Sequence, residues 1–287
     1  PIDKFRPSDK EIQRALKKKK GSNLIYFGPG VHNLPNDTLF VPSGTTVYID
    51  GGARVYGNIF TEGAHDVNIF GRGEVHPDGR GAGVWVRRSK NVRIDGIVVS
   101  QLPIGQCDSV ELTNVKSISY YGWGDGMDVF SSSNVILDGV FCRNSDDCAA
   151  VYASTQGFKG GSNNVLVKNA TLWADVAHPI NIGGHGDPNG MDTVQNVTFR
   201  NIDILDQAEK QVDYQGCLAI NPGDNTLVRN ITFENIRIED FRNGQLVNFR
   251  ISFNPKYCVS TGRGIQNVLV KDVTYNGSGE NLSIIAG

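Results

Sequence analysis

The stretch Gly124–Tyr152, GDGMDVFSSSNVILDGVFCRNSDDCAAVY, contains the pattern that decides the fold. Asp146 and its neighbour Asp147 follow Asp125 after one short apolar strand, and 146 − 125 = 21 residues separate the first acid from the second. If this interval is one turn of a coiled sheet, the carboxylates lie on neighbouring strands, which are about 4.8 Å apart. Glycosidases hold two carboxylates beside the bond that they cleave. The stretch therefore predicts stacked strands that carry a candidate acid pair.

A phrase of the form Asn/Asp-Val-x-Ile/Leu recurs along the chain and extends this pattern. The phrase or a close variant begins at Asp66, Asn91, Asn114, Asn134, Asn164, Asn196, Asn230 and Asn267, at intervals of 25, 23, 20, 30, 32, 34 and 37 residues. Such self-similarity is typical of a solenoid, in which each unit buries its apolar face against its neighbours. Short strands without helices between them favour an all-β fold, a right-handed parallel β-helix. The repeated Asn is interpreted as a left-handed turn residue or a member of a side-chain ladder.

The composition restricts the possible partners. The net charge is −2, which gives no sign of nucleic-acid binding, and no run of 18 apolar residues predicts a membrane span. Glycine makes up 34 of 287 residues, which suits a fold with many tight turns. The five cysteines contain no CxxC pattern, so we expect buried free thiols, no metal site and no cofactor.

The N-terminal segment has its own pattern. Residues 7–20, PSDKEIQRALKKKK, predict a short capping helix, in which Ser8 and Glu11 form a capping box. No linker or change of composition divides the chain, so we expect one β-helix domain over residues 1–287. The chain starts at Pro1 rather than Met, which leaves room for a removed leader or upstream domain.

Four aspartates are the first candidates for chemistry. A lone Asp in a solenoid usually caps a turn, but Asp125, Asp146 and Asp147 fall where consecutive coils would superimpose them. Crowded carboxylates repel one another, which raises the pKa of one and provides an acid and a base. We therefore predict a catalytic role for these three and a substrate-binding role for Asp128.

His178 extends the site by one coil. It follows Asp146 by 178 − 146 = 32 residues, one coil plus a ten-residue insertion, and is predicted to be catalytic. His185 lies in the Gly-rich loop 183–190 and is a weaker candidate for substrate binding. Trp123 and Tyr152 are aromatic candidates, because sugar rings stack on aromatic faces, although solenoids also bury aromatic ladders.

Three segments carry a family resemblance. The sequences GDGMD (124–128), RNSDDCAAVY (143–152) and AHPINIG (177–183) resemble motifs of the polygalacturonase family, glycoside hydrolase family 28. The resemblance implies an inverting, metal-independent hydrolase of a polysaccharide or oligosaccharide, secreted or periplasmic. It implies that Asp146 is the general acid, that Asp125 and Asp147 hold and deprotonate the attacking water, and that His178 lies near the acid. Inversion leads us to expect a gap of about 6.5–9.5 Å between acid and base.

One family motif is missing. The Arg-Ile-Lys motif that grips a galacturonate carboxylate is expected at residues 216–221, where this chain reads GCLAIN without a cation. Arg250 on the next coil is the candidate that could reach across in its place. A carboxylate without a cationic partner binds poorly, so the sequence argues against plain polygalacturonate. A weaker resemblance to the family 49 dextranases points to a neutral α-glucan as an alternative substrate.

Two other classes stay open. A β-helix polysaccharide lyase would need a Lys or Arg base, usually with a Ca²⁺ cluster, and we identify no such base among the predicted site residues. A carbohydrate-binding β-helix without activity would not need the three acids at all.

Overall fold

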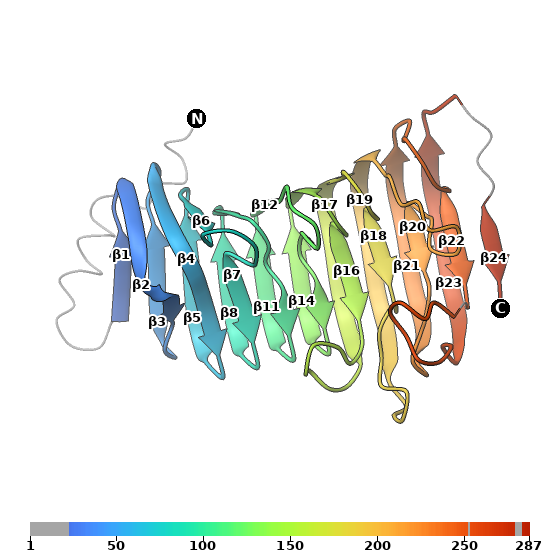
Figure 1. Cartoon of the computed structure of the whole chain (residues 1–287), viewed down its shortest axis with the longest axis horizontal. Helices are drawn as coiled ribbons and strands as arrows, with labels where there is room; N and C mark the ends of the chain where they lie inside the picture. The colour runs from blue at the N-terminus through green and yellow to red at the C-terminus, as the bar shows by residue number, and fades with distance from the viewer. Residues whose placement is uncertain (1–22, 252, 279–282) are drawn as a thin grey trace.

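The described residues form a right-handed parallel β-helix, as the repeats predicted. The computed structural model describes residues 23–251, 253–278 and 283–287. Successive coils stack along the long axis of the molecule, from blue to red in Figure 1. The capping helix predicted for residues 7–20 lies outside the described residues. The described part of the chain has no helix that is long and apolar enough to cross a membrane.

Three parallel faces run along this solenoid. The site face, so called because it carries the predicted acids, contains β7 (Val84–Arg87), β10 (Ile104–Gly105), β13 (Val129–Phe130), β16 (Ala149–Tyr152), β18 (Ile180–Ile182), β20 (Leu218–Ile220), β22 (Val247–Arg250) and β24 (Ile284–Ala286). The second face contains β1 (Asn23–Phe27), β3 (Thr45–Ile49), β5 (His65–Gly71), β8 (Lys90–Asp95), β11 (Asp108–Thr113) and β14 (Ser133–Asp138). The third contains β6 (Glu74–His76), β9 (Val98–Val99), β12 (Lys116–Ile118) and β15 (Phe141–Asn144).

Longer strands bend from one face to the next. They are β2 (Gly30–Phe40), β4 (Ala53–Glu62), β17 (Ser162–Ala174), β19 (Thr193–Asp206), β21 (Leu227–Ile238) and β23 (Gly264–Tyr275). Loops between the elements after β16 account for the lengthening intervals of the repeat, and they lie at the ends of the site-face strands.

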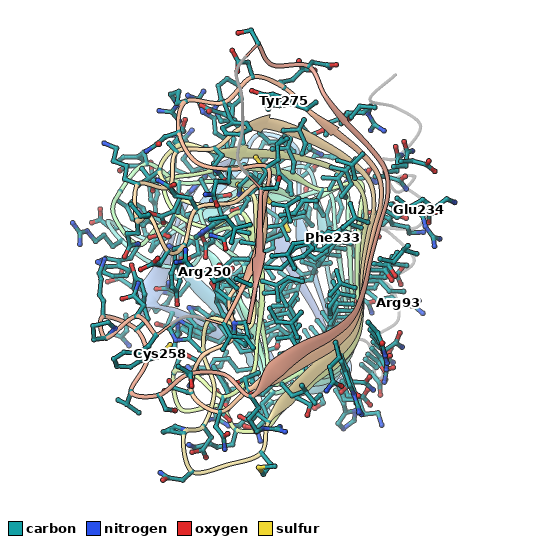
Figure 2. All side chains as sticks on the ribbon, turned by 90° about the vertical axis from the view of Figure 1, so that its right-hand side faces the viewer. Arg93, Phe233, Glu234, Arg250, Cys258 and Tyr275 are labelled. Atoms are coloured by element: carbon teal, nitrogen blue, oxygen red, sulfur yellow. The ribbon has the colours of Figure 1, made fainter. Side chains whose placement is uncertain are left out.

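The hydrophobic core lies between the faces. Alternate side chains of each strand point inward. Because the coils are in register, similar side chains of successive coils stack on one another. One such column contains Val67, Val92, Val110, Val135, Val165, Val197 and Ile231, all fully buried or nearly so. Figure 2 shows Phe233 between the faces and Glu234 on the outer side. Each coil is therefore stabilised mainly by the coils on either side. The five cysteines are buried and free, as expected.

The repeated Asn serves both of the structural roles that the sequence allowed. Asn164, Asn196 and Asn230 have φ of 58°, 56° and 56°, in the left-handed region. Their amides also form an exposed ladder, in which Asn230 Nδ2 donates to Asn196 Oδ1 (3.1 Å) and Asn196 Nδ2 donates to Asn163 Oδ1 (2.8 Å). The repeat therefore encodes a turn between coils.

Replacing Asn196 by Ala is expected to lower the free energy of unfolding by about 1–2 kcal/mol, because Ala is strained in the left-handed region and removes two amide hydrogen bonds. Asn196→Gly is the matched control, since it removes the same hydrogen bonds without the strain. Urea unfolding of the two variants measures the difference. Equal stability of the Ala variant and the wild type would contradict this role.

Candidate functional site

A cavity of about 260 Å³ opens on the outer side of the site face. The four predicted catalytic residues, Asp125, Asp146, Asp147 and His178, line it. The predicted substrate-binding residues Trp123, Asp128, Tyr152 and His185 line it as well.

Arg250 stands apart from this group. It is not among the residues that line the cavity, and its Nη2 lies 2.9 Å from Asp213 Oδ1. Figure 2 shows Arg250 on the outer side of β22, away from the core. Because Asp213 already neutralises its guanidinium, the structure does not offer Arg250 as a free carboxylate clamp.

Backbone register brings the catalytic candidates together. The Gly126 N–H donates to the Asp147 carbonyl (2.7 Å), and the Cys148 N–H donates to the His178 carbonyl (2.8 Å). Asp125, Asp147 and His178 therefore stand on three successive coils. Gly126 permits this approach, because a Cβ there would lie 2.2 Å from the Cys148 carbonyl oxygen. The coil arithmetic had predicted this stacking.

The three acids lie closer together than an inverting mechanism led us to expect. One carboxylate oxygen from each of Asp125, Asp146 and Asp147 lies within 4.8 Å of the others. The predicted gap of about 6.5–9.5 Å does not apply to these nearest oxygens, because adjacent coils are only about 4.8 Å apart. A water that donates two hydrogen bonds of ordinary length spans acceptors about 4.5 Å apart, so one water fits between two of these carboxylates.

Asp147 is held by four hydrogen bonds. Its Oδ1 accepts from the His178 backbone N–H (3.0 Å) and from His178 Nδ1 (2.7 Å). Its Oδ2 accepts from the Tyr152 hydroxyl (2.7 Å) and from Asn181 Nδ2 (2.9 Å). Burial would raise the pKa of this carboxyl, but the charge on His178 and these hydrogen bonds outweigh burial and lower the pKa to about 2. Asp147 is therefore a fixed, buried anion.

His178 is the buried partner of that anion. Its Nδ1 faces Asp147, and its Nε2 donates to the carbonyl of Tyr214. Burial opposes the positive charge, but the Asp147 carboxylate outweighs it and raises the pKa of His178 to about 9. Since both ring nitrogens face acceptors, the ring is an imidazolium at neutral pH. Only 1% of the surface of His178 is exposed, and both of its ring nitrogens already have protein partners.

Asp146 has the opposite character. It is half-buried, and burial together with the charge of Asp147 raises the pKa of its carboxyl to about 7. Burial and the neighbouring acids also raise the pKa of Asp125 and of Asp128 well above the ordinary value. The cluster thus contains one fixed anion, Asp147, and one carboxyl, Asp146, that is about half protonated at pH 7. Such a split between acids of one residue type is the arrangement that acid–base catalysis needs.

Among the described residues, Asp125, Asp146 and Asp147 also have carboxylate oxygens that are close enough together to bind a cation. However, four donors already occupy the acceptor positions of Asp147. This arrangement favours shared protons over a metal ion.

Sequence reasoning missed several cavity residues. Asn181, Glu209, Gln211, Tyr214 and Tyr257 also line the cavity. Asn181 lies in the recognised segment 177–183, three residues after His178, and that position was a usable signal. The other four come from irregular loops before β20 and after β22, which carry no repeat. Among the described residues that line the cavity, none is Lys or Arg.

Comparisons with known proteins agree with this geometry. The family model "Glycosyl hydrolases family 28" matches residues 71–284. A polygalacturonase of Juniperus ashei is 26% identical over 216 residues, which cover 72% of this chain and 39% of the relative. The family 28 exopolygalacturonase of Yersinia enterocolitica superimposes with a TM-score of 0.71 at 15% identity, over 99% of this chain and 67% of that one.

The weaker resemblance also has a structural counterpart. Dex49A from Penicillium minioluteum superimposes with a TM-score of 0.52 at 13% identity, over 92% of this chain and 57% of that one, which shows a shared fold alone. The chain spans 39%, 52% and 55% of the length of the first three curated relatives that it matches. Since the family model matches 284 − 71 + 1 = 214 of the 287 residues, the chain belongs to glycosyl hydrolase family 28.

Proposed function

We propose that this chain hydrolyses glycosidic bonds of a polysaccharide with inversion, through the acids of the cavity. The observation that carries the proposal is the cluster Asp125, Asp146 and Asp147, whose oxygens lie within 4.8 Å of one another while the pKa values of two members are about 7 and about 2. Membership of family 28, rather than the distance between the acids, supports inversion.

The proposed reaction uses Asp146 as the general acid and Asp125 as the general base. Protonated Asp146 donates its proton to the glycosidic oxygen as the bond from that oxygen to the anomeric carbon breaks. A water that donates a hydrogen bond to ionised Asp125, beside the Asp147 anion, attacks the anomeric carbon and passes a proton to Asp125. We assign proton transfer from water to Asp125 rather than Asp147, because four hydrogen bonds occupy Asp147 and its pKa of about 2 makes it a weak base, whereas burial raises the pKa of Asp125 and makes its ionised form the stronger base.

Other cavity residues support this arrangement. His178 is a positioning residue, which keeps Asp147 ionised and oriented. Asp128 Oδ1 and Asn181 Oδ1 are buried without a hydrogen-bond partner among the described residues. Buried polar atoms without partners are costly, so these two are the proposed contacts for substrate hydroxyls. Trp123, which is 61% exposed, offers a ring for sugar stacking at the rim.

The proposed substrate is a polysaccharide or an oligosaccharide derived from it, with no nucleic acid or membrane as partner. We place the enzyme outside the cytoplasm, secreted or periplasmic, because a polysaccharide cannot cross a membrane to reach it. One hydrophobic core runs through the described coils, which supports a single β-helix domain.

The test is the release of reducing ends from a panel of polygalacturonate, rhamnogalacturonan, dextran, pullulan and a sulfated galactan, with Asp146→Asn alongside. The proposal would be supported if the wild type releases reducing ends from one of these substrates and the variant does not. Release from a neutral glucan would favour the dextranase-like alternative for the substrate. Tight binding without release from any substrate would overturn the proposal in favour of a carbohydrate-binding β-helix. An unsaturated product would instead identify a lyase.

The rate of hydrolysis is expected to fall as the pH rises through about 7. The general acid must be protonated, and Asp146, which faces Asp147, His178 and Glu209, has a pKa of about 7. Below that pH Asp146 keeps its proton, while Asp147 stays ionised down to about pH 2. A profile of kcat/KM against pH measures this descending limb. A rate that is flat from pH 6 to 9 would contradict the assignment of Asp146.

A further inference from the structure

On the coils that follow the cavity, side chains that point outward from the site face are covered by other parts of the protein. Asn181 on β18 pairs in register with Ala219 on β20, and Ala219 pairs with Asn248 on β22. These side chains point outward, because the neighbours of each in its strand point into the core. Nevertheless Ala219 and Asn248 are 0% exposed. Something therefore lies on top of them.

Asn248 is covered by the loop at residues 213–216, because its Nδ2 donates to the Asp213 carbonyl (3.5 Å) and a Cβ at Gly216 would lie 2.9 Å from Asn248 Cβ. A second loop, residues 253–258, which we call the strap, packs against Tyr214 of this cover. The ring of Tyr257 lies 5.5 Å from that of Tyr214, and its hydroxyl accepts from Gln211 Nε2 (3.2 Å). On the other side of the face, Cys258 Sγ donates to the Gly184 carbonyl (3.2 Å). The strap follows β22, whereas Gln211 precedes β20, so the strap is attached on both sides of the site face.

The strap also reaches the earlier coil that carries Asp125. The ring of Tyr257 lies 6.4 Å from that of Trp123, edge to face, and the Lys256 ammonium lies 5.1 Å from the centre of the same Trp123 ring. Trp123 precedes β13 and Tyr257 follows β22, so this contact joins the two lateral rims of the cavity. A polymer lying along the site face would have to pass through it.

On the coils that precede the cavity, the side chain of Phe158 covers the site face. Phe158 is 3% exposed, and its ring lies 6.2 Å from that of Phe130 and 6.4 Å from that of Trp85. It rests directly on Gly105, where a Cβ would lie 2.4 Å from the Phe158 ring. The outward surface of β10 is therefore occupied by protein and not available to a sugar chain.

We propose that the cavity is a pit closed at both ends of the site face, which admits the end of a polysaccharide but not an internal segment. The enzyme would then release sugars from chain ends, and the strap with Trp123 would determine this specificity. The cavity of about 260 Å³ lies just below the range of about 300–1,000 Å³ for pockets that take drug-sized ligands, so it holds roughly one or two sugar residues. The inference rests on the proposed function and specifies its mode of action.

The covered site face also agrees with the absence of the Arg-Ile-Lys motif at residues 216–221. Within residues 216–221, Cys217 and Leu218 belong to the hydrophobic core, and Ala219, which faces outward, is fully buried as well. A cation there would point into protein rather than toward a sugar. Lys256 on the strap instead places a cation over the Trp123 ring at the rim.

The test uses hexamers of the polysaccharide that the panel identifies, beginning with the galacturonate hexamer, with a fluorescent label at the reducing end. Early products are resolved by size. Release from a chain end gives one fixed small product and a ladder that shortens by that unit. A mixture of dimers, trimers and tetramers from the first minutes would overturn the pit, while leaving the proposed hydrolysis intact. No hydrolysis of any polysaccharide would instead overturn the proposed function.

The double variant Lys256→Ala/Tyr257→Ala tests the strap itself. Opening the end wall is expected to raise the proportion of mid-chain products about tenfold, which corresponds to roughly 1.4 kcal/mol in relative transition-state energy. Phe253→Ala is the matched control, because this aromatic residue belongs to the same strap, is 48% exposed and does not line the cavity. Circular dichroism checks that the double variant is folded. If the folded double variant gives the same products as the control, the strap does not determine the specificity.

Discussion

Replacing Asp146 by Asn is expected to lower kcat about 100- to 10,000-fold, the range that general acid catalysis contributes. The amide has nearly the shape of the carboxylic acid, but it cannot give a proton to the departing glycosidic oxygen. The pKa of Asp146 is about 7, so much of the enzyme carries a protonated, uncharged Asp146 near neutral pH. Asn is uncharged as well, so substrate binding should change little. We therefore expect the loss in kcat and not in KM.

Initial rates on the substrate found in the panel measure this effect. Asp37→Asn is a suitable control, because Asp37 is exposed on β2, far from the cavity, and Asn tolerates its φ of 55°. The variant should also lose the descending limb of the pH profile near pH 7. Full activity of Asp146→Asn would refute the role of general acid.

Replacing His178 by Ala is expected to lower the free energy of unfolding by about 3–5 kcal/mol, because removing one partner of a buried ion pair leaves the other charge uncompensated. Asp147 would keep its buried position but lose the hydrogen bond and the positive charge of the imidazolium. His65→Ala is the matched control. His65 pairs with Asp66 at 2.9 Å, but both side chains are mostly exposed, so the expected change is below about 1 kcal/mol.

Urea unfolding as a function of pH distinguishes this ion pair from simple loss of packing. The pKa of His178 is raised from 6.5 to about 9, so its contribution is complete below pH 6.5 and is lost as the pH rises through 9. The pKa of Asp147 is lowered from 3.8 to about 2, so its contribution is complete above pH 3.8 and is lost as the pH falls through 2. The difference between wild type and variant should therefore be largest from pH 3.8 to 6.5.

A double-mutant cycle with Asp147→Asn completes the test. If the pair acts as a unit, the double variant should be more stable than the sum of the two single changes predicts. A difference between wild type and His178→Ala that does not vary with pH would show that packing, not charge, accounts for the loss.

The repeat contained most of the information about the fold. Asn134 and its equivalents mark the same turn in successive coils, because a left-handed backbone at a fixed position favours Asn. Alternation of apolar residues after each Asn defined the inward face of each strand. Since parallel coils repeat in register, the interval between Asp125 and the Asp146–Asp147 pair was enough to predict that these acids meet.

The catalytic candidates could be predicted for the same reason, but their individual roles could not. Asp146 and Asp147 are adjacent in the sequence and have the same side chain, yet the turn between β15 and β16 directs Asp147 toward four buried donors and leaves Asp146 half-buried at the cavity. Their pKa values differ because hydrogen bonds and burial differ, and neither is visible in the sequence. The position of His178 was predicted, but its complete burial behind Asp147 was not.

By itself, the sequence determined the coils, their register and the meeting of the acids, since these follow from local periodicity and the fixed distance between strands. Only the tertiary structure decided the shape of the cavity. The strap contacts Trp123 across 257 − 123 = 134 residues, and Arg250 pairs with Asp213 instead of reaching the site. Loops outside the repeat have no register to constrain them, so their positions depend on side-chain packing between distant coils.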